Sequence, residues 1–261
     1  MVETSGDVRP RGGDGRPLKA AALAADELRR RIATGELAPG DRLPSEDGLM
    51  AEFDLARTTL REALRILESE GIITVQRGRR GGPRVTRPPI DNLARGLALH
   101  LQMEGTTLRD LDAARQVIEP VLAANMASSC TEDGLNALEE AVASAGAAAR
   151  AADRAAFGRA AAALHGTLYL HGGNTTLAVI AQTLHEVADA YHRLAADHAS
   201  DEQLGRIVQS YRRLRRHVED GEAAAAAEHW REQLASTASG LSRRLNGDTK
   251  LEVFARTATV A

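Results

Sequence analysis

Residues 55–82 read LARTTLREALRILESEGIITVQRGRRGG. The apolar residues of the first half recur at helical spacing and share one face, at Leu60, Ala63, Leu64 and Leu67. Gly71 follows them and predicts the end of the helix, because glycine readily adopts the left-handed conformation of helix C-termini. The β-branched run IITV then predicts a strand, QRGRRGG a turn, and PRVT a return strand. This stretch therefore predicts a helix followed by a two-stranded hairpin.

Two further helices are predicted before this stretch. The apolar spacing predicts one over Leu18–Thr34, with Gly35 as its C-terminal stop. Ser45 suits the N-cap of a second helix that ends at about Phe53, with acidic residues in its first turn. Three helices and a hairpin form a winged helix-turn-helix, which we expect over residues 18–87.

The basic residues of the opening stretch point to a polyanionic partner. Residues 57–87 hold eight Arg against three Glu, although the chain has a formal net charge of −3. The arginines at positions 57, 61 and 65 form a stripe beside the apolar helix face. Thr58 and Thr59 lie in the first turn, where free backbone N–H groups can hold phosphates.

The hairpin turn carries a second basic group, at Arg77, Arg79 and Arg80. Its glycines allow a close approach to a groove of DNA. An arginine stripe alone would suit a solvated helix face equally well. Two cationic elements adjacent in the sequence favour DNA binding over that alternative.

The rest of the chain predicts a helical bundle, so the fold class is mainly α. Helix-periodic segments lie near 91–103, 106–127, 132–151, 153–171, 175–198, 202–219 and 221–244. They predict an all-α bundle of six or seven helices over residues 93–245. The prolines of RPPIDN predict a linker at 88–92, and residues 1–17 have the composition of a disordered arm. The tail, 246–261, suits either a short strand or disorder.

Composition excludes several classes of protein. The single cysteine, Cys130, excludes an internal disulfide framework and suits a reducing cytoplasm. No window reaches the ~18 apolar residues of a membrane helix, and the N-terminus lacks the apolar segment of a signal peptide. The chain has no nucleophile elbow, HExxH motif or phosphate loop. A helical enzyme that uses the histidines is the remaining enzymatic alternative.

These motifs together resemble a known family. Residues 18–87 resemble the DNA-binding domain of GntR-family transcription regulators, through GELAPGDRLPSE (35–46), the opening stretch and its wing RGRRGG (77–82). The remainder resembles the FCD effector domain of the FadR-like subfamily, through RQVIEPVLAANMA (115–127), LHGTLYLHGGNTTL (164–177) and EDGEAAAAAEHWREQL (219–234). The resemblance implies a cytoplasmic repressor that binds a pseudo-palindromic DNA operator as a homodimer and responds to a small effector.

The resemblance also implies which residues contact DNA. They are Arg57, Thr58, Thr59 and Arg61 in the third helix, and Arg77, Gly78 and Arg79 in the wing. Two positions depart from the family pattern: Asp47 stands where a basic residue is usual, and Ala56 stands where a Ser or Thr N-cap is usual. Arg42 is close in sequence to Asp47 and is a candidate replacement contact. We therefore expect DNA binding with an altered operator preference.

Many FCD domains bind a divalent metal through one Asp and three His. Here only His165 is kept, while Ala161, Tyr211 and Gln233 occupy the other ligand positions. Alanine, tyrosine and glutamine are poor ligands for zinc or nickel, so the sequence predicts no tightly bound metal and no cofactor. Other histidines, notably His185 and His192, leave a rebuilt site and hence a metal sensor open as the alternative.

The resemblance implies an effector pocket lined by Arg115, His165, Asn174, Tyr211 and Gln233. Arg115 suits a carboxylate or phosphate group, or alternatively an ion pair with Glu119 four residues later. Asn174 suits the N-cap of the following helix or the pocket wall. The effector class remains open among an organic acid, a fatty acid and an acyl-CoA.

Overall fold

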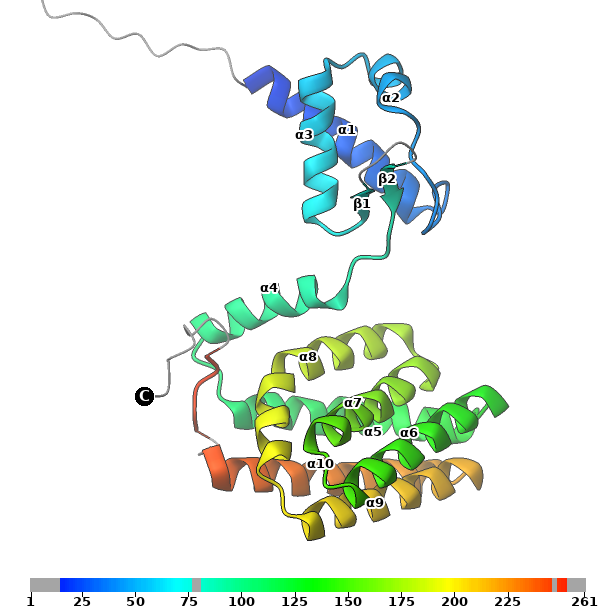
Figure 1. Ribbon diagram of the computed structural model, residues 1–261, viewed down its shortest axis with the longest axis vertical. Coiled ribbons are helices and arrows are strands. Elements are labelled where there is room, and N and C mark those ends of the chain that lie inside the picture. Colours follow the sequence, from blue (N-terminus) through cyan, green and yellow to red (C-terminus); the bar gives the residue numbers. More distant parts are fainter. Residues whose placement is uncertain (1–14, 77–80, 246–247, 253–261) are drawn as a thin grey trace, which may run out of the picture. The chain divides into compact units, whose positions relative to one another are not determined.

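The computed structural model describes residues 15–76, 81–245 and 248–252. The chain forms two compact units, Met1–Asn92 and Leu93–Ala261 (Figure 1). The first holds α1 (Gly15–Ala33), α2 (Glu46–Phe53), α3 (Arg57–Ser69), β1 (Ile73–Gln76) and β2 (Gly82–Val85). The second is helical, and the chain enters it through α4 (Ile90–Met103). The predicted fold class is confirmed, because three helices and a hairpin precede an all-α unit.

The core of the first unit forms where the sequence predicted it. Leu60, Ala63, Leu64 and Leu67 of α3 are buried. They pack in one apolar cluster with Leu28 of α1 and Leu49 of α2. The antiparallel hairpin pairs Ile73 with Val85, and both side chains are also buried in this cluster. The helix-turn-helix and its wing therefore share one core.

Local signals set the ends of α2 and α3. The Ser45 side chain accepts a hydrogen bond from the Gly48 N–H at 3.1 Å, as expected of an N-cap. Ala56 stands at the N-cap of α3, where its methyl group cannot accept such a bond. Gly71 has a φ of +75°, the left-handed conformation that ends the helix before β1.

Two expected boundaries differ from the structure. Helix α1 begins at Gly15, inside the segment expected to be an arm. Helix α4 (Ile90–Met103) begins inside the expected linker at 88–92. Proline is excluded from helix interiors but is tolerated immediately before a helix, and the Pro89 carbonyl accepts a bond from the Asn92 N–H at 3.1 Å.

The second unit is a bundle of seven described helices. After α4 they are α5 (Leu108–Ser128), α6 (Glu132–Arg150), α7 (Arg154–His171), α8 (Thr175–Asp197), α9 (Asp201–Glu219) and α10 (Ala223–Leu245). Helices α5 and α10 pack along each other, as do α6 and α7 (Figure 1). No helix among the described residues is both long and apolar enough to cross a membrane.

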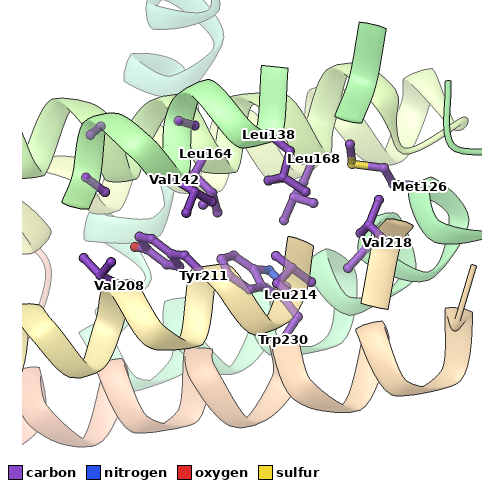
Figure 2. Close-up of a cluster of buried hydrophobic side chains, with 14 of the residues drawn as sticks. Met126, Leu138, Val142, Leu164, Leu168, Val208, Tyr211, Leu214, Val218 and Trp230 are labelled. Carbon is purple, nitrogen blue, oxygen red and sulfur yellow. The ribbon is translucent and has the colours of Figure 1, made fainter. Parts of the chain in front are cut away.

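An aromatic pair occupies the middle of the bundle core. Figure 2 shows Tyr211 and Trp230 on one side of the cluster and Leu138, Leu164 and Leu168 on the other. The rings of Tyr211 and Trp230 have centroids 6.2 Å apart. Trp230 is fully buried and supplies the largest side chain of this core. Its polar indole N–H is buried as well and therefore needs a hydrogen-bond acceptor inside the bundle.

Part of the C-terminal tail packs against the bundle as an extended segment, residues 248–252, which we call the C-terminal strap. The Leu251 N–H donates to the Thr106 carbonyl at 3.0 Å, and the Leu108 N–H donates to the Thr249 carbonyl at 3.1 Å. Leu251 is buried with apolar residues of α4, α5 and α8. The strap therefore pairs with the residue before α5 through one isolated β-bridge, between Lys250 and Thr107. The rest of the tail lies outside the described residues.

Leu251→Ala should destabilise the helical unit. Removing a buried leucine side chain costs about 2–4 kcal/mol of unfolding free energy, through lost burial and the cavity left behind. Leu170→Ala is the matched control, because Leu170 is 79% exposed. Chemical denaturation followed by circular dichroism measures both. Equal stability of the two variants would show that the strap does not pack in solution.

Candidate functional sites

The start of α3 presents basic and hydroxyl groups on the surface of the first unit. The side chains of Arg57 and Arg61 are 57% and 60% exposed. Thr58 is exposed and Thr59 is half-buried. Since α3 begins at Arg57, the free backbone N–H groups of its first turn lie beside these side chains. The arrangement can hold phosphate oxygens or reach base edges.

Two acidic residues of α2 lie against these arginines. The Arg57 Nη2 atom is 3.0 Å from Asp47 Oδ1 and its Nε atom is 4.0 Å from Glu46 Oε2. The Arg61 Nε atom is 3.8 Å from the same Glu46 oxygen. Sequence reasoning noted the acidic Asp47 but missed these ion pairs, which depend on the packing of α2 against α3. Exposed pairs of this kind contribute at most about 1 kcal/mol, so a phosphate can replace the carboxylates.

The remaining expected DNA contacts lie near the hairpin. Arg42 is exposed and forms an isolated backbone bridge with Arg84 of β2. This bridge places Arg42 beside the wing, although the sequence related it to Asp47. Arg77, Gly78 and Arg79 lie outside the described residues. In the sequence they stand between Gln76 and Gly82, which pair with each other in the hairpin.

A buried carboxylate organises the interior of the second unit. Glu119 of α5 is fully buried and accepts a hydrogen bond from Arg115 Nε at 2.7 Å. Its second oxygen lies 2.7 Å from His165 Nδ1 and accepts a bond from the Trp230 indole N–H at 3.2 Å. Glu119 thus ties α5 to α7 and α10. The sequence offered Glu119 only as a partner of Arg115 and gave no signal for the other two contacts.

Arg115 extends this network to α8. Its Nη1 atom lies 2.9 Å from His192 Nε2, and its Nη2 atom lies 3.3 Å from His185 Nδ1. The rings of His165 and His185 have centroids 4.8 Å apart. We call these five residues, Arg115, Glu119, His165, His185 and His192, the buried polar cluster. The histidines on α8 join it because they are two helical turns apart and face the same way.

The charges of the buried polar cluster are fixed by their neighbours. Burial opposes ionisation of Glu119, but the Arg115 guanidinium and His165 together hold the pKa of this carboxyl well below its usual range. Burial, together with the nearby His165 and Arg115, lowers the pKa of His185 to about 2. Burial and Arg115 also lower the pKa of His192. At neutral pH, His185 and His192 are therefore neutral groups beside a permanent guanidinium cation.

A cavity of about 280 Å³ opens against this cluster. Four of the five residues expected in the pocket line this cavity, namely Arg115, His165, Tyr211 and Gln233. His185, His192 and Asp112 also line it and were not among the expected pocket residues. Apolar side chains, including Phe157, Leu204 and Ile207, form another part of the wall. The cavity therefore combines a polar part, which holds the Arg115 guanidinium and the Asp112 carboxylate, with an apolar part.

Two alternatives left open by the sequence are answered by these contacts. Arg115 forms the ion pair with Glu119 and also lines the cavity, so the two interpretations hold together. Asn174 caps α8, accepting a hydrogen bond from the Leu177 N–H at 3.0 Å, and its side chain is exposed. The expectation that Asn174 lines the pocket is wrong for this cavity, because capping holds its side chain at the helix end.

The residues present do not fit the metal site of many FCD domains. Ala161 lines the cavity with a methyl group at the expected aspartate position. His165 is engaged by Glu119, and the Arg115 guanidinium lies against the two α8 histidines. Within the described ranges no three His, Cys, Asp or Glu residues are arranged to hold a metal ion.

Together, a winged helix with an exposed basic helix start and a helical unit with an internal cavity define a two-domain protein of the winged-helix class. Residues 20–81 match the family model described as bacterial regulatory proteins, gntR family, and residues 110–236 match the FCD domain. The chain therefore belongs to the GntR family of regulatory proteins and carries an FCD domain.

Relatives of known name are consistent with this family. The chain is 32% identical over 133 residues to the HTH-type transcriptional repressor NanR of Klebsiella aerogenes, covering 49% of this chain and 50% of that one. It is 31% identical over 146 residues to NanR of Cronobacter sakazakii, covering 54% and 55%. The chain thus spans about half the length of the curated relatives it matches.

A solved structure shares the fold. Streptococcus agalactiae GntR matches with a TM-score of 0.63 and 24% identity, covering 83% of this chain and 97% of that one.

Acidification should destabilise the helical unit. The unfolded histidines take up protons near pH 6.5, whereas the folded His185 and His192 resist protonation. Below about pH 6.5 the unfolded chain therefore binds more protons than the folded chain. The free energy of unfolding then falls by up to about 1.4 kcal/mol per pH unit for each of the two histidines. Urea denaturation between pH 7.5 and 5 should give a shallower decline for His185→Asn than for wild type. His198→Asn, at an exposed position, is the control and should leave the slope unchanged.

Proposed function

We propose that this protein is a transcription repressor that binds a pseudo-palindromic operator as a homodimer and releases it in response to a small organic acid. The observation that carries the proposal is a single chain with two parts, an exposed basic helix start in a winged helix and a cavity beside a buried arginine in a helical bundle. Localisation in the cytoplasm belongs to the same proposal.

On the DNA side, the start of α3 would enter the major groove and bring four residues to the DNA, Arg57, Thr58, Thr59 and Arg61. Arg77, Gly78 and Arg79 would follow in the wing, and Arg42 is close to the wing through its bridge to Arg84. Asp47 and Glu46 would be displaced from the arginines on binding. Their negative charge beside the helix start would disfavour some sequence contacts, which supports an altered operator preference.

On the effector side, the hydrogen-bonding groups around Arg115 suit a small organic acid. Arg115 is a permanent cation whose neighbours, His185 and His192, are neutral and can donate or accept hydrogen bonds. His165, Tyr211 and Gln233 supply further polar groups on the wall. The volume of about 280 Å³ favours a small organic acid over a fatty acid or an acyl-CoA. Differential affinity for two conformations would couple the acid to DNA release.

The homodimer is proposed through the helical unit. Val117 and Val121 are four residues apart on one face of α5, and they are 72% and 44% exposed. Exposed apolar surface is commonly covered by a protein partner. A second copy of the chain would cover it and place two recognition helices on one pseudo-palindromic site.

The recognition-helix assignment is tested on DNA selected from a random pool by the wild-type protein. Arg57→Ala and Arg61→Ala should each lose roughly tenfold in affinity, because an arginine contact to DNA contributes about 1–3 kcal/mol. Asp47→Asn should gain affinity, since it removes a competing carboxylate from Arg57. Arg213→Ala makes the same charge change on an exposed part of α9 and serves as control. Unchanged binding by both α3 variants would refute the assignment.

The effector cavity is tested by filling it without changing its charge. Ala161→Phe places a ring at the cavity wall and should abolish binding of any organic acid that the wild type binds. Ala163→Phe, at an exposed position of the same helix, should bind normally. Calorimetric titration with a panel of small organic acids, followed by DNA binding with each ligand, gives both readouts. Near-stoichiometric zinc or nickel in untagged protein would instead favour a metal sensor.

A further inference from the structure

A second hollow lies between α6 and α9 and is separate from the effector cavity. It measures about 500 Å³. Its walls are formed by Glu139, Val142, Ala143, Arg150, Gln209, Arg212, Arg215 and Arg216. As far as the described residues define them, the two sites share no lining residue. Four of the eight residues are arginines, so the hollow has a strong positive charge.

The missing side chain of Gly146 on α6 leaves room for guanidinium groups from two helices. Gly146 is buried where α6 faces α9. A methyl group at Gly146 would lie 3.4 Å from Arg150 Nη1 and 3.7 Å from Arg212 Nη2. The two guanidinium groups therefore approach the same point, one from the end of α6 and one from the middle of α9.

The carboxylates near the hollow are already used. Arg215 forms ion pairs with Glu139 across the two helices and with Glu219 at 2.8 Å on its own helix. Arg150, Arg212 and Arg216 have no ion pair with a carboxylate in the described parts of the chain. Like charges held this close repel one another unless an anion lies between them.

We propose that this hollow binds a small phosphorylated molecule. Guanidinium groups match phosphate oxygens with paired N–H donors, and three uncompensated arginines suit a group that carries about two negative charges. The Gln209 amide adds a neutral donor, and Val142 and Ala143 offer an apolar floor for the carbon skeleton. A single carboxylate would leave most of these donors without a partner. None of its lining residues belongs to the proposed organic-acid cavity or to the residues proposed to contact DNA.

Calorimetric titration of the full chain with pyrophosphate and with glycerol phosphate tests the proposal, with sulfate as a comparison anion. Wild type should bind one or both phosphate compounds, glycerol phosphate more tightly than sulfate if the carbon skeleton contributes. Arg150→Gln and Arg212→Gln should each weaken binding at least tenfold. Arg213→Gln is the matched control, since Arg213 lies on α9 outside the hollow, and it should bind as wild type.

Three results would overturn the proposal. Wild type could fail to bind either phosphate compound, or Arg213→Gln could weaken binding as much as the hollow variants, which would indicate net charge alone. The hollow variants could also reduce duplex DNA binding while small phosphates do not bind, which would assign the surface to DNA. All these arginines are at least partly exposed, so the variants should keep the wild-type melting temperature, which checks that the fold is intact.

Discussion

The helical unit depends on one buried carboxylate, Glu119. A buried charge is tolerated only when it is paired and hydrogen-bonded, and Glu119 meets this condition through Arg115, His165 and Trp230. These partners come from α5, α7 and α10, so satisfying one charge fixes the relative positions of three helices. The same contacts leave Arg115 facing the cavity, where its remaining donors reach the α8 histidines. Structural stability and the chemistry of the cavity thus share the same residues.

Acidic neighbours control the arginines at both candidate functional sites in different ways. At the start of α3, Asp47 and Glu46 form exposed ion pairs that a phosphate group can replace. In the bundle, the pair between Arg115 and Glu119 is buried and holds its geometry. The exposed pairs can exchange partners, whereas the buried pair keeps the Arg115 guanidinium at the cavity wall. Burial is the physical difference between them.

The sequence predicted most of the secondary structure because its signals are local. Helix α3 was predicted from the spacing of Leu60, Leu64 and Leu67, and all three are buried. The Ser45 cap and the Gly71 stop depend on nearby backbone groups and were also correct. The linker at 88–92 was less accurate, because prolines exclude a helix interior but allow a helix to begin directly after them. The strap residue Leu251 was not predicted, since its partners are far away in the sequence.

The sequence by itself determined the two-part architecture, the basic start of α3 and four of the residues that line the cavity. It could not determine which side chains share a charge. The contacts of Glu119 with His165 and Trp230, the convergence of His185 and His192 on Arg115, and the pairing of Arg57 with Asp47 all join different helices. Periodicity shows which face of a helix is buried but not which helix packs against it. Only the tertiary structure sets those neighbours, and with them the charge at each site.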